Sequence, residues 1–128
     1  MSIDLRNAST AALAYLGDAV LELLVRERLV ELGYTSSKSL NAHALQFVRA
    51  AAQAEAMEHI LPVLTEEEAA AFRRGRNIGH TNTPKSATVA QYRSATGMEA
   101  LFGYLHIKGE QQRLKELFEL AYPRKENV

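Results

Sequence analysis

The spacing of apolar side chains predicts a first helix near the N-terminus. Apolar residues recur there every three or four positions, the period of one helix face: Leu13, Leu16, Val20 and Leu24. Ser9 or Thr10 can cap the start of this helix, and Gly33 can end it in the left-handed conformation. We therefore expect a helix that runs to about Leu32.

A second periodic segment, residues 40–61, contains neither proline nor glycine. A polar turn at residues 34–38 precedes it, and Ser39 can cap its start. Its apolar positions again follow the helical period: Ala44, Phe47, Val48, Ala51, Ala54 and Met57. The pattern leaves open whether the segment is one long helix or two helices joined by a kink. Pro62 ends it in either case.

Three more helices follow in the second half of the chain. Thr65 and Glu68 have the spacing of a capping box, which predicts a helix that ends at about Arg74. Helical periodicity returns from residue 87 to Gly109, and residues 110–121 form a last amphipathic helix. No stretch shows the sustained alternation of apolar and polar residues that is typical of a strand, so the pattern predicts an all-α fold.

Residues 75–85 separate two of these helices and contain two glycines, a proline and several short polar side chains. This composition predicts a loop. A chain of 128 residues has the length of one domain, which we expect to span residues 1–128 with flexible tails at about 1–8 and 123–128.

Composition restricts the classes of function. Fifteen Lys and Arg balance fifteen Asp and Glu, so no net field draws the chain to nucleic acid, and any phosphate contact must come from a local patch. The absence of cysteine excludes disulfides, thiolate metal sites and cysteine nucleophiles. The sequence shows neither a leader pattern nor an apolar run of membrane-spanning length, and we expect a soluble cytoplasmic protein with no membrane partner.

Gly17 and Asp18 interrupt the otherwise apolar first helix. Glycine destabilises a helix interior by roughly 1 kcal/mol relative to alanine, a cost that is tolerated where another backbone comes close. Asp18 lies off the apolar stripe. The residues alone leave two interpretations of Asp18, a solvated surface charge or a functional carboxylate.

Two segments resemble the ribonuclease III family. Residues 16–23, LGDAVLEL, are similar to its signature helix, and residues 96–103, TGMEALFG, are similar to a later helix in which an acid precedes Ala-Leu-hydrophobic-Gly. The resemblance implies a ribonuclease III endonuclease-domain-like helical bundle, homodimeric through its signature helices. Because the sequence stops soon after residues 122–125, the resemblance narrows to the Mini-ribonuclease III subfamily, in which the catalytic domain stands alone.

The resemblance implies a metal-dependent endoribonuclease that hydrolyses phosphodiester bonds in double-stranded RNA. Asp18 and Glu99 would be catalytic and would bind Mg²⁺, for which Mn²⁺ can substitute. Glu55 is a third expected metal ligand, because its segment is similar to one that carries a supporting acid in the family; the alternative is an exposed helix glutamate. Full-length members have further acids at the positions of Ala14 and Thr96, so we expect weak metal binding before RNA arrives.

Basic residues gather around the expected loop. The RGRN and TPK elements are similar to the corresponding loop of Mini-ribonuclease III, and the expected RNA contacts are Arg73, Arg74, Arg76, Asn77 and Lys85. Double-stranded RNA is recognised mainly through phosphates and 2′-hydroxyls, which suits this mixture. The alternative is a solvated helix end beside a loop.

The resemblance also implies partners. The expected substrate is precursor large-subunit ribosomal RNA, and a ribosomal protein is a further expected partner. The dimer would use apolar positions off the main stripe of the first helix: Tyr15, Val25 and Leu29. A rival hypothesis is a non-catalytic ribonuclease III-like module that binds structured RNA or a ribosomal partner. The missing acids at Ala14 and Thr96 support that rival. A third hypothesis is a helical dimerisation domain without RNA.

Overall fold

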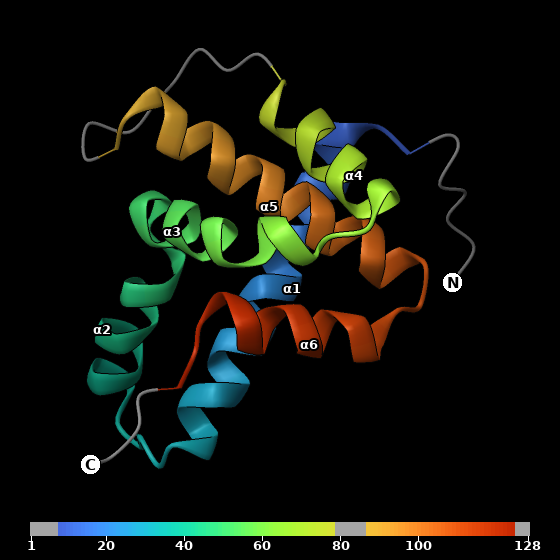
Figure 1. Cartoon of the computed structure of the whole chain (residues 1–128). Coiled ribbons are helices and arrows are strands. Elements are labelled where there is room, and N and C mark those ends of the chain that lie inside the picture. The colour runs from blue at the N-terminus through green and yellow to red at the C-terminus, as the bar shows by residue number, and fades with distance from the viewer. Residues whose placement is uncertain (1–7, 79–86, 125–128) are drawn as a thin grey trace.

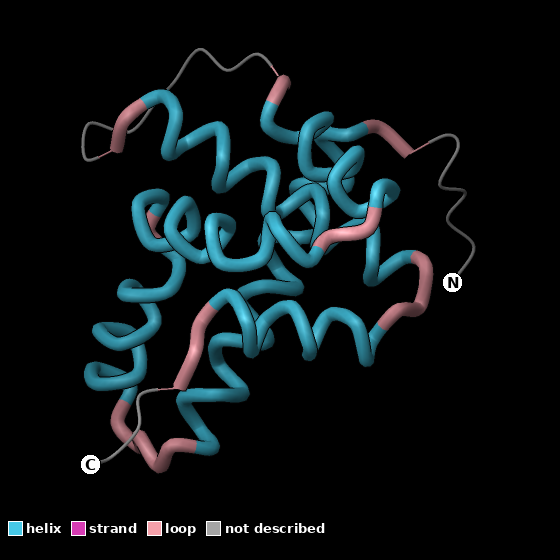
Figure 2. The backbone as a smooth tube through the Cα atoms, in the orientation of Figure 1, coloured by secondary structure: helices cyan, strands magenta, loops and turns pink. Residues whose placement is uncertain are grey.

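The computed structural model describes residues 8–78 and 87–124, and every regular element in these ranges is helical. The helices are α1 (Thr10–Glu31), α2 (Ser37–Val48), α3 (Ala50–Ile60), α4 (Glu66–Arg76), α5 (Val89–Ile107) and α6 (Gln111–Ala121), with a short 3₁₀ turn, η1, at Leu61–Val63. Figure 2 shows only helices and loops in the described part of the chain. The all-α class is confirmed.

The polar residues at the helix ends act largely as the sequence predicts. Ser9 caps α1 by accepting the backbone N–H of Ala12 at 3.0 Å, and Gly33 follows the helix with a φ of +93°. Thr65 and Glu68 form both hydrogen bonds of the expected capping box at the start of α4. These local signals depend on neighbouring residues alone, which is why sequence identifies them.

The second periodic segment differs from the expectation at its start. The second segment begins earlier than predicted, because Ser36 caps α2 in place of Ser39. The question of one helix or two is also resolved: Arg49 has an extended backbone, with φ −63° and ψ 146°, and separates α2 from α3.

The loop predicted at residues 75–85 also begins later than expected. Gly75 and Arg76 still belong to α4, and Asn77 caps the end of that helix. Most of the predicted loop, with Lys85, lies outside the described residues, as do most residues of the predicted tails.

Helix α5 is the centre of the molecule (Figure 1). It packs against α1, α3, α4 and α6, and buries both its apolar side chains and its glycines. The largest fully buried side chains come from α1, α3, α5 and α6: Phe102, Leu21, Leu29, Met57, Ile60, Met98, Leu101, Leu114, Leu117 and Val25. In the described part of the chain, no helix combines the length and the apolar character that a membrane crossing requires.

Two glycines allow α1 and α5 to cross with their backbones in contact. A Cβ atom on Gly17 would lie 1.6 Å from the carbonyl oxygen of Glu99, and one on Gly103 would lie 2.0 Å from the carbonyl oxygen of Leu13. Real Cβ atoms do not approach backbone so closely, so only glycine fits at these positions. The expectation that Gly17 admits a second backbone is confirmed, and the second backbone belongs to α5.

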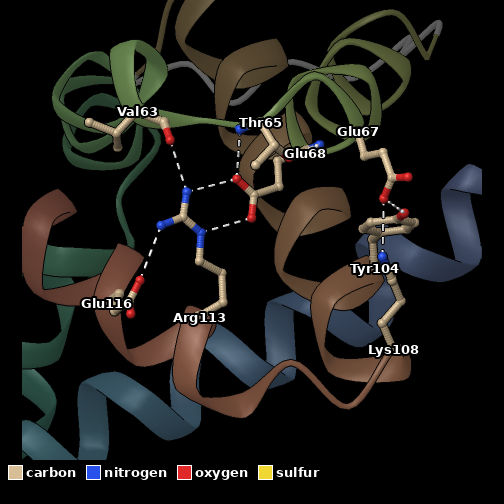
Figure 3. Close-up of polar contacts among 8 residues, drawn as sticks. All are labelled: Val63, Thr65, Glu67, Glu68, Tyr104, Lys108, Arg113 and Glu116. Carbon is tan, nitrogen blue, oxygen red and sulfur yellow. Dashed lines mark hydrogen bonds and ion pairs between the residues drawn. The ribbon is translucent and has the colours of Figure 1, made fainter.

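A partly buried ion pair between Arg113 and Glu68 holds α4 in place (Figure 3). Arg113 of α6 binds both carboxylate oxygens of Glu68, at 2.8 and 2.9 Å, and donates a further hydrogen bond to the carbonyl of Val63. The hydrogen bond from Arg113 is the main reason that the pKa of Glu68 lies below its usual value. The network fixes the start of α4 against α6 and so orients the helix that carries Arg73, Arg74 and Arg76.

Candidate metal centre and nucleic-acid interface

The crossing of α1 and α5 places the carboxyl groups of Asp18 and Glu99 side by side. Asp18 follows Gly17 on α1 and its side chain is exposed, whereas Glu99 lies half-buried on α5 with its own carbonyl against Gly17. The Glu99 carboxyl forms a hydrogen bond with Asp18 and is subject to its charge. The fold therefore brings together the two acids that the sequence singles out from distant segments.

Burial and the neighbouring acid change the protonation of this pair. Burial, then the charge of Asp18 and its hydrogen bond, raise the pKa of Glu99 to about 8, and only a hydrogen bond from Gln53 opposes the shift. Two adjacent carboxylates cannot both be ionised at low cost. At neutral pH the pair therefore retains a proton, and a divalent cation bound between the two groups would compensate the same repulsion.

Gln53 of α3 completes the surroundings of Glu99. Its side chain is 3% exposed, and its amide hydrogen-bonds to the Glu99 carboxyl. This residue was not among those singled out from the sequence, because an isolated glutamine carries no motif. The one signal for it was its position as the single uncharged polar side chain in the alanine-rich run at residues 50–56.

Glu55, the third expected metal ligand, does not lie beside Asp18 and Glu99. Residues two apart on a helix point in nearly opposite directions, so the rotation that directs Gln53 to Glu99 turns Glu55 away from it. Glu55 is exposed and lines a cavity of about 490 Å³ between α1, α2, α3 and the end of α6, together with His43, His59 and Tyr122. The structure does not bring Glu55 to the Asp18–Glu99 pair.

The positions of the missing acids are closed to a cation. Ala14 and Thr96 are 8% and 6% exposed, and the Thr96 hydroxyl donates to the carbonyl of Tyr92 at 3.1 Å. Within the described residues, no group of three or more His, Cys, Asp or Glu side chains could hold a metal ion. A set of two carboxylates suits Mg²⁺, which keeps several water ligands and is commonly bound through one or two carboxylates together with substrate phosphates.

The three arginines that we expect to contact RNA lie on the last turn of α4. Arg73, Arg74 and Arg76 are exposed, and so is Asn77, whose side-chain oxygen accepts a hydrogen bond from Arg76 at 3.4 Å. The guanidinium of Arg76 also lies over the ring of Phe72, 5.7 Å from its centre. This end of α4 presents three cations to solvent, as a surface that contacts phosphates requires.

One face of α1 exposes three large apolar side chains beside the Glu22–Arg26 ion pair. Tyr15, Leu23 and Val30 are 86%, 59% and 67% exposed and follow one another around the same side of the helix. The expectation that Val25 and Leu29 belong to such a face was wrong: both are buried in the core, at 0% and 2% exposure. Because α1 is covered by α5 on one side only, its apolar positions divide between core and surface in a way that periodicity does not resolve.

Comparison with known proteins agrees with this arrangement. The model of the ribonuclease III domain family matches residues 11–110. The Mini-ribonuclease 3 of Symbiobacterium thermophilum is 50% identical over 109 residues, which cover 85% of this chain and 84% of that protein. The Mini-ribonuclease 3 of a Thermoanaerobacter species is 43% identical over 115 residues, covering 90% and 81%. A crystal structure of a Fusobacterium nucleatum protein superposes with a TM-score of 0.83 at 32% identity, covering 94% of this chain and 96% of that one.

Proposed function

The chain belongs to the ribonuclease III family, and we propose that it cleaves double-stranded RNA at a divalent cation held between Asp18 and Glu99. The activity is that of a metal-dependent endoribonuclease, as the family implies. The observation that carries the proposal for the site is the α1–α5 crossing, in which Gly17 allows Asp18 to reach the carboxyl of Glu99.

The proposed cation is Mg²⁺, with Mn²⁺ as a substitute, because the two side chains offer hard oxygen ligands. When bound, such a cation activates water and neutralises the charge that develops on the scissile phosphate. Asp18 is exposed and so can reach solvent and substrate. Glu99 would hold the cation as a carboxylate, with the proton that it otherwise retains passing to solvent, and the α1–α5 contact holds both groups in place.

The exposed arginines at the end of α4, Arg73, Arg74 and Arg76, are proposed to contact the RNA backbone. Asn77 and Lys85 are proposed to contribute further contacts. In a chain whose formal charge is zero, attraction to phosphate must be local. Guanidinium groups bind phosphate oxygens through paired hydrogen bonds. Glu55 is not included in the metal site, because it lines the cavity on the other face of α3.

We further propose that two copies of the chain pair through the exposed apolar face of α1. That face exposes Tyr15, Leu23 and Val30, and the Glu22–Arg26 ion pair lies on the same side of the helix. Asp18 lies beside the same face. A two-fold axis through it would therefore place two metal sites close to one interface, so that a single duplex could contact both.

The proposed natural substrate is precursor large-subunit ribosomal RNA, processed in the cytoplasm, and a ribosomal protein is the proposed delivery partner. These parts of the proposal depend on the family resemblance. A comparison of the chain's cleavage products on ribosomal RNA precursors and on an unrelated duplex of equal length tests them. Equal cleavage of both substrates would contradict a dedicated role in ribosomal RNA maturation.

The central experiment incubates long double-stranded RNA with the protein in Mg²⁺ and in EDTA. We expect cleavage only in Mg²⁺, and we expect Asp18→Asn and Glu99→Gln each to abolish it. The double variant should be no worse than either single variant, because both substitutions remove one site. Glu58→Gln, a change of an exposed glutamate on α3, is the matched control.

Two results would contradict the proposal. Binding without cleavage in Mg²⁺ would favour the rival hypothesis of a non-catalytic RNA-binding module, and wild-type turnover by either acid variant would remove that residue from the site. Glu55→Gln distinguishes the structure from the sequence-based expectation. The structure predicts that this variant retains cleavage, whereas a metal-binding Glu55 predicts its loss.

A further inference from the structure

Gln53 differs from the other buried polar side chains of the described chain in what it binds. The other three are Arg28, Glu68 and Thr96. Arg28 binds the carbonyl of Tyr122 and the carboxylate of Glu119, Glu68 binds Arg113, and Thr96 binds a carbonyl of its own helix. These three side chains join elements of the fold or satisfy a local backbone group. The amide of Gln53 instead reaches the carboxyl of Glu99.

The chemistry of an amide suits this position. A buried polar group without a partner costs roughly 1–3 kcal/mol, so a glutamine at 3% exposure needs the hydrogen bond that it makes. Its N–H donates to one carboxylate oxygen and leaves the remaining lone pairs of Glu99 for a cation. Because the amide is neutral, it orients the carboxylate without the charge by which Lys or Arg would repel a divalent cation.

The surroundings of Glu99 indicate why its carboxylate needs a hydrogen-bond partner. The positions that would carry further acids are occupied by Ala14 and Thr96, which are buried and offer no carboxylate. With only two carboxylates in the site, the orientation of each has a large effect on cation binding. The break at Arg49 sets the direction of α3, and this direction determines that Gln53 faces α5.

We propose that Gln53 is a positioning residue, whose side-chain amide fixes the Glu99 carboxylate in the orientation in which it shares a divalent cation with Asp18. The inference rests on the proposed metal site.

The test replaces Gln53 by methionine, which has similar length and no donor. We expect the Mg²⁺ concentration for half-maximal cleavage to rise by about 10- to 100-fold, the usual effect of losing the hydrogen-bond partner of a metal ligand. Saturating Mg²⁺ should restore much of the rate. The affinity of the RNA-free protein for Mn²⁺, measured by electron paramagnetic resonance, should fall in the same direction. Gln53→Asn keeps a polar group but is one methylene shorter, and it should shift both measurements in the same direction.

Thr96→Val is the matched control, because it also replaces a buried polar side chain by an apolar one of similar shape, and the Thr96 hydroxyl binds backbone. Melting temperatures of all variants separate loss of fold from loss of cation affinity. An unchanged Mg²⁺ dependence in both Gln53 variants, or an equal shift in Thr96→Val, would overturn the inference and leave the metal site intact. Wild-type cleavage by Glu99→Gln would instead overturn the metal site itself.

Discussion

At the scale of single residues, the environment of Glu99 predicts how the stability of the protein depends on pH. In the unfolded chain its carboxyl ionises near its ordinary pKa of 4.5, whereas burial and Asp18 raise the pKa to about 8 in the folded protein. Between these two values the folded protein binds more protons than the unfolded chain. The contribution of Glu99 to the free energy of unfolding therefore falls as the pH rises from about 5 to 8.

We predict that, in EDTA, urea denaturation shows this loss of stability between about pH 5 and pH 8, and that Glu99→Gln removes most of it. The lowered pKa values of Glu68 and Glu119, caused first by hydrogen bonds from Arg113 and Arg124, act at lower pH and do not contribute to this slope. Mg²⁺ favours the ionised pair and should reverse the trend. An identical slope in Glu99→Gln and the wild type would show that the carboxyl does not retain a proton.

At the scale of elements, the glycine contact between α1 and α5 both stabilises the fold and builds the site. Gly17 and Gly103 lie within one crossing, each against a backbone carbonyl of the other helix. A methyl group at either position must separate the helices, because a backbone atom cannot move aside as a flexible side chain can. Separation of the helices would also separate Asp18 from Glu99.

We predict that Gly103→Ala lowers the free energy of unfolding by at least about 1–3 kcal/mol, the usual cost of overpacking, although alanine is the better helix former. The variant should also lose cleavage, since it moves both carboxyls. Gly33→Ala is the control: this glycine has a φ of +93° and no atom within 4 Å of an added Cβ. It should lose about 1–2 kcal/mol through backbone strain and keep cleavage. Full activity in Gly103→Ala would show that the close crossing is not required.

At the scale of the whole molecule, the exposed face of α1 bears on assembly. We predict that Leu23→Glu together with Val30→Glu converts the protein to a monomer, raising the dimer dissociation constant at least about 30-fold, because charges would be desolvated in an apolar contact. Analytical ultracentrifugation measures this change. Leu120→Glu, a change on the outer face of α6 at 47% exposure, should leave the dimer intact. A monomeric wild type would rule out the assembly.

The basic end of α4 bears on how the whole molecule approaches RNA. We predict that replacing Arg73, Arg74 and Arg76 by alanine weakens RNA binding and makes the dependence of log affinity on log salt less steep, by roughly 0.7 to 0.9 for each phosphate that is no longer bound. Cation affinity should not change. Lys115→Ala, an exposed change on α6, is the control, and an unchanged slope in the triple variant would place the RNA groove elsewhere.

The sequence by itself determined the helices and several of their caps, and it singled out Asp18 and Glu99, which the fold brings together. Periodicity and capping depend on residues within a few turns, so Ser9, Thr65 and the first helix could be identified from the order of the residues alone. Gly17 could likewise be recognised as the point where another backbone approaches. The segment around Glu99 resembles a family pattern, and that resemblance drew attention to its acid before the packing of α5 was known.

Only the tertiary structure decided which faces of these helices meet. Gln53 and Glu55 are near neighbours in sequence, and the orientation of α3 after the break at Arg49 directs the amide, not the acid, toward Glu99. Similarly, the packing of α5 on α1 buries Val25 and leaves Leu23 exposed, although both are apolar. The physical reason is that a local pattern fixes the rotation of residues around one helix axis, whereas the surroundings of a side chain depend on how separate axes cross.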